Sequence, residues 1–127
     1  MNHFEGLESE RVFYFSEEIS KLPRCSGNEK EVSDYMVKFA QERNLEVFQD
    51  EIYNIIIKKP ATPGYEAAPS MALRGHLEMV CEKNMNIVHD FSKDPISLVV
   101  KDGMIYADGT TLGADNGIAV AMAMAVL

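Results

Sequence analysis

The most constraining feature of this sequence is its last segment, which is apolar without interruption. Residues 117–127 are GIAVAMAMAVL, so ten consecutive apolar residues follow Gly117. A helix without a polar side needs protein all around it, because its surface would otherwise face water. A chain of 127 residues has few elements with which to enclose such a helix. We therefore expect an uncovered apolar face on this helix, and a sequence that forms the front part of a longer protein.

Composition limits the class of protein. With 46% hydrophobic and 25% charged residues, the chain has the makeup of one globular domain. The net charge of -8 argues against a nucleic-acid partner, which would require clustered Lys and Arg. The N-terminus has no apolar signal core, and no apolar run reaches the ~18 residues that a membrane span needs. We expect a cytoplasmic protein with no membrane partner.

The two cysteines, Cys25 and Cys81, support the same location. Two cysteines outside any CxxC pair do not suggest a disulfide framework, which fits a reducing compartment. Cys81 follows the apolar Val80, so we expect it to be a small core residue.

The periodicity of apolar residues predicts an α/β chain, with a mixed sheet and flanking helices. A first helix is expected over residues 8–21, ended by Pro23. A second helix, capped by Ser26 or Asn28, is expected to run to about residue 44. Strands are expected at residues 45–50, 53–57, 71–80, 96–100 and 104–107. The run at 55–57 indicates a strand buried on both faces, and Asp-Gly at 102–103 indicates a hairpin.

One candidate site motif is His76 with Glu78, in the strand expected at 71–80. Side chains alternate along a strand, so these two project from the same face. An imidazole can bind a metal through one nitrogen while a nearby carboxylate holds the ring. The same pair also fits a polar edge strand that faces water.

A second motif places Asp115 among small residues, in TTLGADNG, directly before the apolar helix. Ligand sites of open α/β sheets gather at strand ends and helix starts, so His76 and Asp115 could share a divalent cation. Imidazole and carboxylate suit zinc, cobalt or manganese better than magnesium or calcium. Asp and Asn are also preferred helix caps, so a purely structural role for Asp115 stays open.

Four segments resemble the aminoacyl-histidine dipeptidases, which are dinuclear zinc peptidases: PRCSGNE, GHLEMVCEKN, HDFSKDP and DGTTLGADNGIAVAMA. The resemblance extends from about residue 7 to the end of the sequence. It implies that residues 1–127 form part of a metallopeptidase catalytic domain, without the rest of that domain or a lid or dimerisation domain. It further implies that the full-length enzyme is a homo-oligomer that hydrolyses dipeptides with a C-terminal histidine (Xaa-His).

The resemblance also assigns roles to individual residues. His76 matches a zinc ligand, and Asp115 matches the carboxylate that bridges two zinc ions, with a cis Asp115–Asn116 peptide bond. Glu78 is the candidate catalytic residue, matching the carboxylate that orients the zinc-binding imidazole. The family usually has Asp there, and the extra methylene of Glu moves the carboxylate by ~1 Å or changes its rotamer.

The remaining functional residues of the family have no counterpart within 127 residues. These are a Glu-Glu pair, which supplies a general base and a zinc ligand, a further Asp and a distant His. We therefore expect the chain alone to bind metal weakly and to turn over no substrate. The alternative is a catalytically silent module that self-associates or binds a partner through its apolar face.

Overall fold

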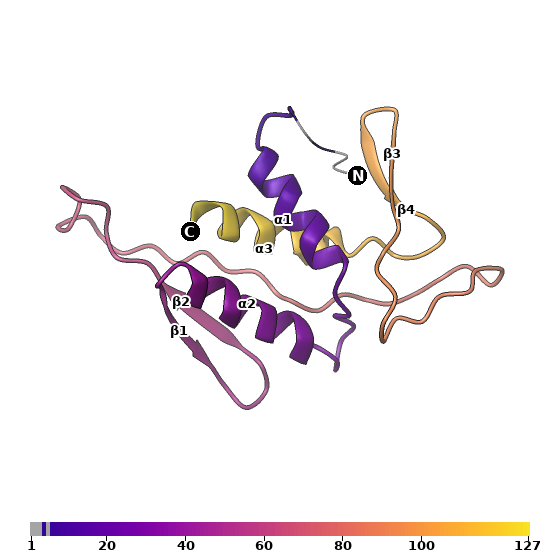
Figure 1. Ribbon diagram of the computed structural model, residues 1–127, viewed down its shortest axis with the longest axis horizontal. Coiled ribbons are helices and arrows are strands. Elements are labelled where there is room, and N and C mark those ends of the chain that lie inside the picture. The colour runs from indigo at the N-terminus through magenta and orange to yellow at the C-terminus, as the bar shows by residue number, and fades with distance from the viewer. Residues whose placement is uncertain (1–3, 5) are drawn as a thin grey trace.

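The computed structural model describes residue 4 and residues 6–127 (Figure 1), and these residues form helices and short antiparallel strand pairs. The helices are α1 (Glu10–Ser20), α2 (Lys30–Glu42) and α3 (Ala114–Val126). The strands are β1 (Glu46–Gln49), β2 (Ile55–Lys58), β3 (Leu98–Lys101) and β4 (Met104–Ala107). Strand β1 pairs with β2, and β3 pairs with β4. The expected combination of sheet strands with flanking helices is confirmed.

The core lies where α1 and α2 pack around α3. Figure 1 shows α1 crossing α3, with α2 lying beside them. Phe15 of α1 meets Phe39 of α2 edge to face at 5.4 Å between ring centroids. The buried cluster comprises Phe15, Ile19, Met36, Phe39, Val120, Ala121 and Met124. Met122 and Val126 stay exposed on the other side of α3, so the uncovered apolar face expected there is confirmed.

The local elements agree with the periodicity, with three corrections. The hairpin at Asp102-Gly103 is confirmed, and both residues have the positive φ of a tight hairpin turn, 53° and 72°. The cap of α2 is Glu29, which makes no side-chain capping hydrogen bond, so the capping role expected of Ser26 or Asn28 is wrong. Burial of β2 on both faces is also wrong, because the two-stranded sheet packs one face on α2 and leaves Ile56 56% exposed.

The third correction concerns the strand expected at 71–80, which does not form. Within the described chain only Met79 makes a bridge there, in parallel with Cys25. The Met79 N–H donates to the Arg24 carbonyl at 2.9 Å, and the Ser26 N–H donates to the Met79 carbonyl at 3.1 Å. The residues before Met79 belong to no strand, because no described strand runs beside them to complete a ladder.

The two cysteines are joined, contrary to the expectation of a reducing compartment without a disulfide framework and of a core role for Cys81. Cys25 and Cys81 form a disulfide with their Cα atoms 5.7 Å apart. The bridge between Cys25 and Met79 explains this, because it brings the chain two residues before Cys81 alongside the loop after α1. The loop from Cys25 and the segment that contains His76 are therefore linked by main-chain hydrogen bonds and by a covalent bond.

Candidate metal site

The candidate site forms where residues 75–79 cross the beginning of α3. The His76 N–H donates to Oδ1 of Asn116 at 3.1 Å, although the two residues are 40 positions apart. A Cβ atom on Gly75 would lie 2.8 Å from that same oxygen. Glycine at position 75 therefore lets the two segments approach closely enough for this hydrogen bond.

The structure brings together the two residues for which the sequence predicts metal binding. Nε2 of His76 lies 3.0 Å from Oδ1 of Asp115. Two ligands of one tetrahedral zinc ion, each at ~2.0–2.2 Å, lie ~3.4 Å apart. The side chains are 47% and 93% exposed, so both can adjust by a few tenths of an ångström. This geometry fits a pair of ligands that share an ion.

The imidazole of His76 is oriented by the main chain of Glu78. Nδ1 lies 3.0 Å from the Glu78 carbonyl oxygen and 3.4 Å from its Oε1. The carbonyl is at normal hydrogen-bonding distance, whereas the carboxylate is outside the ~2.7–2.9 Å of a charge-assisted hydrogen bond. An Nδ1–H that donates to the carbonyl leaves the lone pair on Nε2, which faces Asp115. The longer Glu side chain thus adds negative charge near the ring while the backbone fixes its orientation.

Neighbouring acceptors favour the protonated form of this histidine. The hydrogen bond to the Glu78 carbonyl contributes most to raising the pKa of His76 above its usual value, and the Glu78 and Asp115 carboxylates add to it. The same arrangement attracts a divalent cation, which would replace the proton on Nε2.

Asp115 does not cap the helix that follows it. The cap of α3 is Gly113, with φ 73° and no side-chain capping hydrogen bond. Asp115 itself has non-helical angles, φ -91° and ψ 99°, and a cis peptide bond joins it to Asn116. The cis bond implied by the resemblance is therefore confirmed. The Asp115 carboxylate projects to His76 and solvent, so the capping alternative is wrong.

Three polar residues that sequence reasoning missed hold the two segments together. Asn116 accepts from the His76 main chain, as described above. Thr111 donates its hydroxyl to the Val80 carbonyl at 2.7 Å and accepts from the Glu82 N–H at 3.2 Å. Arg24 donates to carbonyls of both segments. The signals in the sequence were that Thr111 and Asn116 belong to the motif around Asp115 and that Arg24 belongs to the segment PRCSGNE.

The ligand set formed by the described residues is incomplete. No group of three or more His, Cys, Asp or Glu side chains converges anywhere in residue 4 and residues 6–127. A structural zinc site uses four protein ligands, and a catalytic zinc site uses three with an open position. His76 and Asp115 have suitable chemistry for zinc, cobalt or manganese, but further ligands would have to join them.

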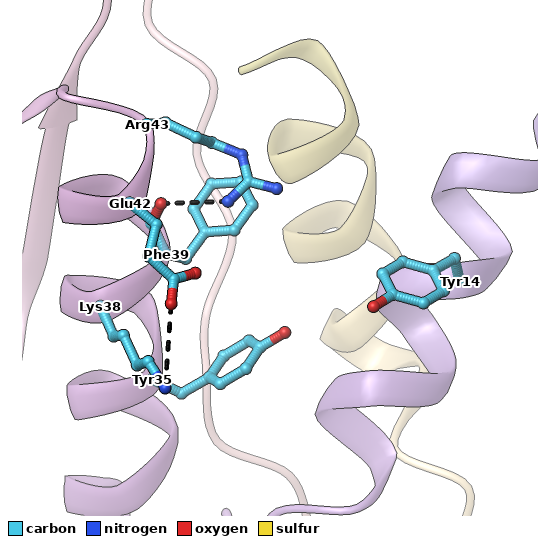
Figure 2. Close-up of a pocket in the computed structure, with 6 residues that line it drawn as sticks. All are labelled: Tyr14, Tyr35, Lys38, Phe39, Glu42 and Arg43. Atoms are coloured by element: carbon cyan, nitrogen blue, oxygen red, sulfur yellow. Dashed lines mark hydrogen bonds and ion pairs between the residues drawn. The ribbon is translucent and has the colours of Figure 1, made fainter.

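A separate hollow lies between α1 and α2 and contains none of these residues (Figure 2). The side chains that line it are Tyr14, Tyr35, Lys38, Phe39, Glu42 and Arg43. The Arg43 guanidinium lies 3.7 Å from the centre of the Phe39 ring and donates to the Phe39 carbonyl. Burial raises the pKa of the Tyr35 phenol. The charged side chains that line the hollow interact with their neighbours on α2. The hollow adds no residue to the His76 site.

Comparison with known proteins supports the resemblance that the motifs suggested. No protein-family model matches the chain. All 127 residues align at 41% identity with the cytosol non-specific dipeptidase of Escherichia coli strain K12. The crystal structure of aminoacylhistidine dipeptidase from Vibrio alginolyticus matches 98% of the chain, with a TM-score of 0.93 and 39% identity. The resemblance to the aminoacyl-histidine dipeptidases is confirmed.

The chain is shorter than either dipeptidase. It spans 26% of the Escherichia coli protein and 25% of the Vibrio alginolyticus chain. Its helices and strand pairs match those of the corresponding part of the Vibrio alginolyticus dipeptidase. No helix in the described ranges has the length and apolarity needed to cross a membrane.

Proposed function

We propose that this chain supplies one part of the active site of a zinc-dependent dipeptidase. The 3.0 Å approach of Nε2 of His76 to Oδ1 of Asp115 carries the proposal, because it pairs two metal-binding groups from segments 39 residues apart. The 41% identity to a dipeptidase over the whole chain supports the reaction class. Zinc, cobalt or manganese would fit these two donors.

In this proposal each residue has a defined task. His76 would hold the metal through Nε2, and Asp115 would hold it through its carboxylate. The Glu78 carbonyl holds the imidazole so that Nε2 faces Asp115. When bound, zinc supplies Lewis-acid polarisation of the scissile carbonyl and lowers the pKa of a coordinated water. The general base and the remaining ligands would have to be supplied by further residues, because the described chain brings no third metal-binding side chain to this pair.

We propose dipeptides with a C-terminal histidine as substrates, in the cytoplasm. The names of the two relatives differ on this point, since one is a non-specific dipeptidase and the other an aminoacylhistidine dipeptidase. The Escherichia coli protein is described as cytosolic, which supports the proposed location. The net charge of -8 supports a small-molecule substrate over a nucleic acid. The exposed apolar side chains of α3 support a homo-oligomer.

A chimeric enzyme tests the proposal. Residues 1–127 of this chain would replace the matching quarter of the Escherichia coli dipeptidase. We expect the chimera to hydrolyse Ala-His in the presence of zinc, with Ala-Ala and Gly-Leu measuring selectivity. H76A and D115A should each reduce turnover by more than the ~10–100-fold typical when a residue that only supports a ligand is lost. H89A, which removes a histidine outside the site, is the control; full activity of H76A in the folded chimera would refute the proposed site.

A second function is favoured by the surface and by the incomplete ligand set. Met122, Val126, Phe48 and Ile56 are large apolar side chains that remain exposed. Exposed apolar side chains of this kind favour association, so the 127-residue chain by itself would be a silent module that self-associates. Sedimentation of the purified chain tests this function, together with its zinc content and its turnover of Ala-His. A monomer that hydrolyses Ala-His would refute it.

A further inference from the structure

Arg24 is a charged side chain buried inside the molecule, next to the candidate site. Only 3% of its surface is exposed. Its Nη1 donates to the Leu77 carbonyl at 3.1 Å, and its Nη2 donates to the Gly113 carbonyl at 2.7 Å. Leu77 directly follows His76, and Gly113 precedes Asp115 by two residues. One planar group therefore bridges the two segments that carry the proposed metal ligands.

This burial is not explained by an ion pair. None of the ion pairs formed within the described residues involves Arg24, and its Nε has no hydrogen-bond partner there. Burial lowers the pKa of the guanidinium. Removing a cation from water without a carboxylate partner is costly, and a well-packed apolar side chain of similar volume is often at least as stabilising. General stability is therefore a poor explanation for arginine at this position.

The start of α3 is shaped around the guanidinium. A Cβ atom on Gly113 would lie 2.5 Å from Nη2 of Arg24, and one on Gly117 would lie 2.8 Å from it. Both distances are shorter than real contacts, so two glycines leave the space that the side chain fills. The Arg24 main chain also takes part, because its carbonyl accepts from the Met79 N–H at 2.9 Å.

We propose that Arg24 is a positioning residue that sets the separation between His76 and Asp115. The guanidinium holds its donors in one rigid plane, so contact with both carbonyls fixes the distance between the two segments. A lysine ammonium is a single point charge on a flexible stem and cannot impose the same geometry. The positioning itself concerns the metal-free chain, and only its consequence for metal binding rests on the proposed function.

NMR of the metal-free 127-residue chain tests the positioning directly. We expect a nuclear Overhauser effect between the His76 ring Hε1 and the Asp115 Hβ protons in the wild-type chain. R24M, which keeps similar length without the donors, should lose this signal, and R24K should weaken it. R11M removes an exposed arginine of α1 and should retain it. Circular dichroism of each variant establishes whether the fold is kept.

G117A is a second variant that tests the proposal if R24M does not fold. Its new methyl group would displace the guanidinium while alanine raises the helix propensity of α3. We expect G117A to weaken the His76–Asp115 signal, with no further loss when it is combined with R24M in a folded protein. Wild-type signals in folded R24M, or in folded G117A if R24M is unfolded, would overturn the proposal.

Calorimetric titration with Co²⁺ separates this proposal from the proposed function. If the wild-type chain binds Co²⁺, R24M should bind it about tenfold more weakly, as when a group that supports a metal ligand is lost. R11M should bind like the wild type. If the wild-type chain does not bind Co²⁺ although the NMR signal is present, the metal site fails and the positioning role of Arg24 stands.

Discussion

Replacing Glu78 by Gln distinguishes the backbone of this residue from its carboxylate as the group that orients His76. The imidazole Nδ1 is 3.0 Å from the Glu78 carbonyl, which every residue at this position retains, and 3.4 Å from the carboxylate. The imidazole is 47% exposed and the Glu78 side chain 40%. An exposed pair of this kind contributes at most ~1 kcal/mol.

That contribution corresponds to about fivefold in an equilibrium constant at most. We therefore expect E78Q to weaken Co²⁺ binding by the chain by less than about fivefold, whereas H76A should abolish binding. The pKa of His76 in metal-free E78Q should fall but remain above its usual value, because the carbonyl hydrogen bond contributes most to raising it. Titration calorimetry gives the affinity, and NMR of the ring protons gives the pKa.

The matched control is E46Q, which removes an exposed carboxylate paired with Lys58 at 3.2 Å, outside the site. It should change neither the Co²⁺ affinity nor the His76 pKa. A loss of tenfold or more in folded E78Q would refute the reasoning, because losses of ~10–100-fold are typical when the group that orients a metal ligand is removed. The carboxylate would then orient the ring despite its longer distance.

Three further predictions concern pH, the disulfide and a glycine. Metal binding should weaken as the pH falls through the raised pKa of His76, because the protonated imidazole has no free lone pair; calorimetry across that range would show a constant affinity if this is wrong. Changing Cys25 and Cys81 to Ser should lower the free energy of unfolding by about 2–4 kcal/mol, since their bond closes a loop of sequence separation 56; equal urea midpoints would contradict this. G113A should destabilise the chain more than G103A in urea, because the glycines have φ 73° and 72° but only Gly113 is packed against other atoms; equal losses would contradict this.

The elements that could be predicted from the sequence are those set by local interactions. The helix periods, the stop at Pro23 and the turn at Asp102-Gly103 depend on residues a few positions apart, and the structure reproduces them within about two residues. The strand expected at 71–80 fails because a strand requires a neighbour, and only Met79 finds one in the described chain. The disulfide could not be predicted for the same reason, since its cysteines are 56 positions apart and meet only in the folded chain.

The candidate site shows the same division between local and distant information. His76 and Asp115 could be found because their residue types and small neighbours indicate metal chemistry. Arg24 could not, because the sequence does not distinguish an arginine that binds two buried carbonyls from one on the surface. Its function depends on a loop, an extended segment and a helix start that meet only in the folded chain.

The distant contacts explain how a segment with little regular structure can present a defined site. Residues 75–78 belong to no described strand, so their conformation is not fixed by a ladder of backbone hydrogen bonds. The Arg24 guanidinium, the Asn116 amide and the Thr111 hydroxyl contact the main chain at three different residues, Leu77, His76 and Val80. Three such contacts constrain the segment in both position and rotation, which one contact would not do. If this is correct, removing any one of these contacts should separate His76 from Asp115 without a comparable loss of stability in the helical core. That core is built from apolar side chains of α1, α2 and α3 and does not depend on these contacts.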